Sequence, residues 1–146
     1  MLENNVSIKL TPEEFDKISQ ALEVINSTLK PHLVQLSPEQ RRQLPKMSDK
    51  TTPFVEKALE MAENHPEFAP STMVVGELKV DFDSVKTLGK IQKPMEKLFN
   101  SLSDTILVAG SEAYIASLAY YNTVKTAAEG DSARAKEIYE ELSQRF

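Results

Sequence analysis

The feature that most constrains the fold of this chain is a hydroxyl residue followed directly by proline, which occurs at three places. The three pairs are Thr11-Pro12, Ser37-Pro38 and Thr52-Pro53. A hydroxyl at an N-cap accepts a hydrogen bond from the first turn of a helix, and proline suits the first helical position because the amide it lacks has no partner there. After the first two pairs, Glu14 and Gln40 stand where a capping box needs them. Each pair therefore predicts the start of a helix.

Apolar residues recur after these starts at alternating spacings of three and four, which is typical of a helix with one face toward a core. Such stripes cover residues 15–29, 54–62, 82–102 and 106–127, and Ile138 and Leu142 anchor a last segment. Strand signals are poor, since the chain has four glycines and no Asn-Gly or Asp-Gly hairpin turn. The sequence predicts an all-α fold, a compact up-and-down-like bundle of four main helices with short extra helices, in a single domain over residues 1–146.

Three positions decide where the helices break. Pro31 interrupts the first stripe, but Leu33 and Leu36 continue it, so a kinked helix is favoured over a helix end. Residues 100–104 are rich in capping side chains, and we predict a tight reversal there, with one continuous helix as the alternative. Gly130 predicts a left-handed residue that closes the central helix, and Asp131 predicts the cap of the last one.

Composition excludes several classes of function. The chain has no cysteine, which rules out disulfides, thiolate metal sites and a cysteine nucleophile, and a reducing cytoplasm suits it. Its net charge of −5 makes nucleic acid an unexpected partner. The first ten residues lack the pattern of a secretion signal. Residues 105–122 are uncharged except for Glu112 and reach the lower limit of the about 20 residues that a membrane span needs, so we expect a core helix rather than a span.

Few residues carry the pattern of a chemical site. The two histidines, His32 and His65, each neighbour a proline and lie outside metal-binding spacings, so neither a metal nor a cofactor is expected. No glycine-rich phosphate loop or nucleophile elbow occurs. Glu112 is the one carboxylate singled out, because its helical neighbours are apolar and burial among them would raise the pKa of its carboxyl group. The alternative is that Glu112 marks a solvated edge of the helix.

Two further groups of residues in the segment 106–127 are candidates. Tyr120 and Tyr121 could line a ligand pocket, since a phenol offers apolar area with a polar tip, although core packing explains them too. Gly110, Ala113 and Ser117 are small residues at helical spacing, and a glycine inside a helix costs up to about 1 kcal/mol relative to alanine. We expect this small stripe to approach a neighbouring helix closely or to form an association surface.

Three stretches together resemble one family of proteins. They are Leu10-Thr11-Pro12-Glu13-Glu14, Met47-Ser48-Asp49-Lys50-Thr51-Thr52-Pro53-Phe54-Val55 and Ala109-Gly110-Ser111-Glu112-Ala113-Tyr114. They look like an uncharacterised family of small helical proteins from Bacteroides-type bacteria, and the resemblance would cover most of the chain. It implies a bacterial helical bundle and brings no activity, cofactor or catalytic residue with it.

Two classes of function remain open. A helical interaction or structural module without catalysis needs only a surface, and its partner is an unidentified protein or another copy of the chain. A small-molecule-binding protein, or an enzyme that uses carboxylates around Glu112, needs a pocket with convergent polar groups. Because the sequence contains no conventional nucleophile and base pair and no metal set, we favour the interaction module.

Overall fold

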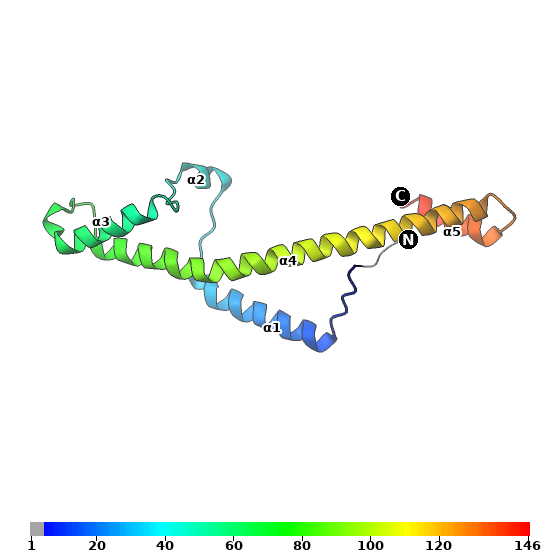
Figure 1. Cartoon of the computed structure of the whole chain (residues 1–146), viewed down its shortest axis with the longest axis horizontal. Coiled ribbons are helices and arrows are strands. Elements are labelled where there is room, and N and C mark those ends of the chain that lie inside the picture. Colours follow the sequence, from blue (N-terminus) through cyan, green and yellow to red (C-terminus); the bar gives the residue numbers. More distant parts are fainter. Residues whose placement is uncertain (1–4) are drawn as a thin grey trace. The chain divides into compact units, whose positions relative to one another are not determined.

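The computed structural model describes residues 5–146, and every regular element in that range is a helix (Figure 1). The predicted all-α class is confirmed, with four long helices and three short helical segments among the described residues. The elements are α1 (Pro12–Leu29), the 3-10 turn η1 (Lys30–His32), α2 (Pro38–Gln43), α3 (Thr52–Asn64), the 3-10 turn η2 (Pro66–Phe68), α4 (Val75–Ala128) and α5 (Ala133–Ser143).

The first two predicted helix starts are confirmed in their hydrogen bonds, whereas α3 begins at Thr52 itself and its N-cap Thr51 makes no side-chain cap hydrogen bond. The Glu14 amide donates to Thr11 Oγ1 at 3.1 Å, and the Thr11 amide donates to Glu14 Oε1 at 3.2 Å. Ser37 and Gln40 form the same reciprocal pair at 3.1 and 2.9 Å. Each box satisfies two amides that a helix start would otherwise leave without partners. Local sequence is therefore enough to fix where α1 and α2 begin.

The prediction of a kinked continuation through Pro31 is wrong. Helix α1 ends at Leu29, η1 follows, and Leu33 is extended, with φ −92° and ψ 148°. Proline cannot donate to the carbonyl one turn back, but it is tolerated at the first positions of a new 3-10 turn, where Pro31 lies.

The predicted reversal at residues 100–104 is also wrong, and its alternative is right. Helix α4 runs without interruption for 54 residues and contains Pro94. Within it, Thr105 Oγ1 donates to the Ser101 carbonyl at 2.6 Å, and other hydroxyls bond one turn back in the same way. A hydroxyl that bonds within its own helix no longer competes with the helical backbone, so the cap-rich composition does not break α4.

The end of α4 differs from its prediction as well. No glycine among the described residues has a positive φ, so Gly130 is not a left-handed cap. The amides of Glu129 and Gly130 instead bond three residues back, each at 3.2 Å, which tightens the last turn without requiring a left-handed residue. The cap of α5 is Ser132, one residue after the predicted Asp131, and its side chain accepts from the Ala135 amide.

The chain divides into two units that share α4, and each is described by itself. The α3 unit comprises Leu10–Met95, and the described part of the α5 unit comprises Glu96–Phe146 together with residues 5–9. The prediction of one domain over residues 1–146 stays a prediction.

In the α3 unit, helix α3 folds back beside the first turns of α4 (Figure 1). Leu59 of α3 and Phe82 of α4 are the buried hydrophobic residues of this unit, and Lys86 places its ammonium 4.3 Å from the Phe82 ring centroid. Helix α1 has no buried residue, and the large apolar side chains of its predicted stripe are exposed or half-buried. The core of this unit is therefore confined to the α3–α4 hairpin.

In the α5 unit, helix α5 packs beside the last turns of α4. Val124 of α4 and Ala135 of α5 are buried, and the rings of Tyr121 and Tyr139 stack with their centroids 5.4 Å apart. Only four residues, 129–132, connect the two helices, so the connection is a tight turn. This hairpin brings Leu142, Arg145 and Phe146 beside the tyrosines of α4.

Replacement of Phe82 by alanine tests the α3–α4 core. Phe82 is only 4% exposed, so its removal should lower the free energy of unfolding by about 3 kcal/mol, measured by urea denaturation. Phe54→Ala is the matched control, because the Phe54 side chain belongs to the same unit and is 74% exposed. Equal losses in both variants would contradict the assignment of the core to the α3–α4 hairpin.

Candidate functional site

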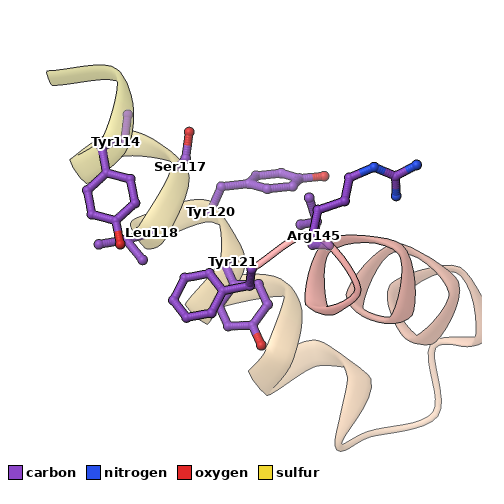
Figure 2. Close-up of a pocket in the computed structure, with 9 residues that line it drawn as sticks. Tyr114, Ser117, Leu118, Tyr120, Tyr121 and Arg145 are labelled. Carbon is purple, nitrogen blue, oxygen red and sulfur yellow. The ribbon is translucent and has the colours of Figure 1, made fainter. Parts of the chain in front are cut away.

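The α5 unit contains an apolar cavity of about 420 Å³ where the end of α5 meets α4 (Figure 2). The structure brings together three predicted residues here, since Ser117, Tyr120 and Tyr121 all line it. The full lining is Tyr114, Ala116, Ser117, Leu118, Tyr120, Tyr121, Leu142, Arg145 and Phe146. We call this cavity the tyrosine groove.

Helical periodicity explains why these side chains converge. Tyr114, Leu118 and Tyr121 follow one another at spacings of four and three, so they lie along one side of α4. Figure 2 shows the Tyr120 ring and the Arg145 side chain projecting toward the same side of the groove, from α4 and from the residues after α5. The groove therefore depends on the α4–α5 hairpin.

Aromatic stacking holds the end of the chain against α4. The Tyr121 ring stacks on Tyr139 and also on Phe146, whose centroid lies 5.2 Å away with the rings 2° from parallel. Such pairs stabilise by about 0.5–1.5 kcal/mol beyond the area they bury. Tyr139 and Phe146 were not among the predicted site residues, because nothing in the sequence pattern of the last helix indicates that it packs on Tyr121.

The phenol of Tyr139 influences the protonation of Tyr121. A hydrogen bond with the Tyr139 side chain raises the pKa of Tyr121 above the value usual for tyrosine, and desolvation and the charge of Tyr139 act in the same direction. Tyr121 is therefore a neutral phenol at physiological pH, able to donate a hydrogen bond.

The one cationic group of the lining is already paired. Arg145 Nη1 lies 2.6 Å from Glu141 Oε2 and donates to the Glu141 carbonyl at 3.0 Å. Both side chains are well exposed, so this pair contributes little to stability. The Ser117 hydroxyl donates to the Ala113 carbonyl at 2.7 Å. The lining contains no Asp, Glu, His or Cys side chain, so the arrangement is suited to binding an apolar group.

Glu112 lies outside the tyrosine groove and has a structural partner. Its Oε1 accepts from the Asn5 amide at 2.6 Å, and its Oε2 accepts from the Val6 amide at 3.5 Å. Glu112 is half-buried, while its helical neighbours Val108 and Ile115 are exposed, so the predicted apolar enclosure is not found. The carboxylate holds the segment before α1 against α4. No local pattern could have indicated this contact, because 107 residues separate Asn5 from Glu112.

Gly110, Ala113 and Ser117 are all exposed. A Cβ atom added at Gly110 would meet nothing within 4 Å, so the close approach to a neighbouring helix that the small stripe predicts does not occur within the chain. Its use as an association surface stays a prediction.

Among the residues that the structure describes, the histidines and the acidic side chains do not come together as a metal centre. His65 caps the end of α3 and its Nδ1 lies 3.4 Å from Glu67 Oε1, and His32 is exposed in η1. Among residues 5–146, no three His, Asp or Glu side chains converge in a way that could hold a metal ion. No helix in this same range has an apolar stretch long enough to cross a membrane.

Comparison of the chain with protein-family models, with curated proteins and with solved structures finds no match. The resemblance to a family of bacterial helical proteins therefore stays a prediction. The assignment of function rests on the exposed surfaces and the tyrosine groove alone.

Replacement of Tyr139 by phenylalanine tests the interaction between the two phenols. The variant keeps the ring stack but removes the hydroxyl, so the pKa of Tyr121 should fall toward the usual tyrosine value. Because the pKa of Tyr121 is higher in the folded state, its neutral phenol stabilises the fold below the unfolded-state pKa. This stabilisation is lost as pH rises through the raised folded-state pKa. An alkaline titration of ¹³Cζ-labelled tyrosine by NMR measures the change. Tyr120→Phe is the control. A pKa of Tyr121 that does not change in Tyr139→Phe would contradict the hydrogen bond between the two phenols.

Proposed function

We propose that this chain is a helical interaction module, which works by packing exposed helix faces on a partner protein. The observation that carries the proposal is the number of large apolar side chains that each unit leaves exposed. Only four hydrophobic residues are buried among the described ones, while large apolar side chains are exposed on α1, α3 and α4.

The exposed side chains are too many to be ordinary surface residues. Single exposed apolar residues are normal in monomers, but contiguous apolar patches mark interaction sites. In α4, Leu98 and Phe99 are exposed on one turn, Leu102 on the next, and Ile106 and Leu107 on the turn after it. Removing such a surface from water is favourable by a free energy of about 25 cal/mol for each Å². A partner that covers these side chains would therefore bind with a strong hydrophobic driving force.

The proposed function is tested by amide hydrogen exchange at several protein concentrations. An isolated helix is only marginally stable in water, so the amides of α4 between residues 98 and 120 should exchange at least about tenfold faster when dilution removes the partner. The amides around Leu59 and Phe82 are the internal control, because their protection comes from within the α3 unit. A chain shown to be monomeric by ultracentrifugation, with α4 protected as strongly as this core, would contradict the proposal.

A small-molecule-binding protein is the second candidate, favoured by the tyrosine groove. Its volume of about 420 Å³ lies in the range of known ligand sites, about 300–1000 Å³, and its lining is mostly apolar. The cytoplasmic location and the bacterial family remain predictions from the sequence under either candidate.

Titration with indole tests the second candidate. An aromatic ligand in the groove would shift the NMR signals of Tyr114 and Tyr120, and Tyr120→Ala should weaken binding about tenfold, since a lost aromatic contact costs about 0.5–1.5 kcal/mol beyond its area. Phe68→Ala, an exposed aromatic of the α3 unit, is the control. Signals that do not move on titration would exclude this class of ligand from the groove.

A further inference from the structure

One side of α4 in the α5 unit carries an uninterrupted series of uncharged residues. The series, here called the α4 face, is Leu98, Leu102, Ile106, Ala109, Ala113, Ser117 and Tyr120. The spacing of four, four and three repeats every 11 residues, which keeps these positions on one side of a nearly straight helix. Its large members are exposed, from 53% for Leu102 to 69% for Ile106.

The α4 face has no charge on it. Residues 98–120 include two charged side chains, Asp104 and Glu112. At 100° for each residue, they stand roughly 180° and 100° around the helix from the centre of the face. A helix side that faces water normally carries charged residues, so this one has the composition of a buried surface.

The face continues a contact that the chain already makes. The next position in the series, Val124, is buried in the α4–α5 hairpin, and the neighbouring Tyr121 stacks on Tyr139 of α5. A helix therefore covers this side of α4 at residue 124, while the large apolar side chains of the face between residues 98 and 120 stay exposed and Ala109 is half-buried. The same side of one helix is built for helix packing along its length, and α5 covers only its last part.

We propose that the α4 face of a second copy of this chain covers the open part, with the two α4 helices antiparallel about a two-fold axis near Ala109. This inference rests on the proposed function and names the partner. A two-fold interface places each patch against itself, so it must not bring like charges together, and the α4 face meets that requirement.

The order of large and small residues favours the antiparallel arrangement. With the axis near Ala109, Ile106 of one copy faces Ala113 of the other, and Leu102 faces Ser117. Large side chains then meet small ones, which allows close interdigitation. A parallel pair would place Ile106 against Ile106 and Ala113 against Ala113, crowding one half of the interface and leaving gaps in the other.

The test combines the mass of the full chain in solution with two neighbouring substitutions. We expect sedimentation equilibrium to give twice the chain mass of 16.4 kDa. Ile106→Asp places a carboxylate on the face and should weaken dimerisation by about a hundredfold or more, because a charge buried without a partner is unfavourable. Leu107→Asp is the matched control, since Leu107 is as exposed as Ile106 but lies off the face, and it should leave the dimer intact.

Cross-linking tests the arrangement in the otherwise unchanged protein. The chain has no cysteine, so an introduced one is unique. Ala109→Cys should give a covalent dimer with a short bis-maleimide. Leu98→Cys and Tyr120→Cys should cross-link when mixed but not alone. These variants do not depend on whether Ile106→Asp keeps its helical content.

Three results would overturn the inference, and they separate it from the proposed function. A dimer that survives Ile106→Asp and is not cross-linked through Ala109→Cys would place the interface elsewhere, and the interaction module would stand. Leu98→Cys that cross-links to itself would show a parallel pair. A chain that stays monomeric would exclude the second copy, and hydrogen exchange on that monomer then decides the proposed function. Protected α4 amides would overturn both, and rapidly exchanging ones only the second copy.

Discussion

A single helix satisfies its own backbone but cannot bury its own side chains, and this difference governs α4. Each interior amide finds a carbonyl four residues back, so nothing in the backbone limits the helix to a few turns. The side chains need a neighbour instead. In the α3 unit that neighbour is α3, which covers Phe82, and in the α5 unit it is α5, which covers Val124. Apolar residues of α4 outside these hairpins have no helix over them within their own unit.

The parts of the fold that the sequence predicts are those decided within one turn of helix. The capping boxes of Thr11 and Ser37 form as expected because each involves only residues three apart. The same local reasoning fails at residues 100–104, where it counts capping side chains but not their partners. Thr105 bonds back to Ser101, and the exposed hydroxyls of the cap-rich segment cost the continuous helix little. Helix starts were predictable from local sequence. Whether the helix breaks at residues 100–104 depends on the competition between a capped reversal and a continuous helix, which the count of capping residues does not decide.

The candidate site was predictable in part for the same reason. Tyr120 and Tyr121 stand on two neighbouring apolar lines of the predicted helix, and both line the groove. Their partners Tyr139 and Phe146 come from the last segment, whose packing partner no spacing reveals. Glu112 shows the larger failure, since its apolar neighbours on α4 suggested an enclosed carboxyl. Its partners are amides more than a hundred residues away in the chain, and only the fold brings them together.

Tyr120 connects the two surfaces of the α5 unit, because it lines the tyrosine groove and also ends the α4 face. A group bound in the groove and a helix packed on the face would both contact this ring. Two binding events that share a residue are coupled, and the coupling is reciprocal. If a ligand in the groove changes the affinity of the α4 face for its partner, the partner changes the affinity for the ligand by the same factor. Whether the coupling is positive or negative depends on the rotamer of the Tyr120 side chain. If one Tyr120 rotamer serves both surfaces, a ligand strengthens the dimer, and if each needs its own rotamer, a ligand dissociates it. An association built on an uncharged face has little other means of control, since neither salt nor pH acts strongly on apolar contacts. The phenol at its edge is therefore the point through which a small molecule could regulate the assembly.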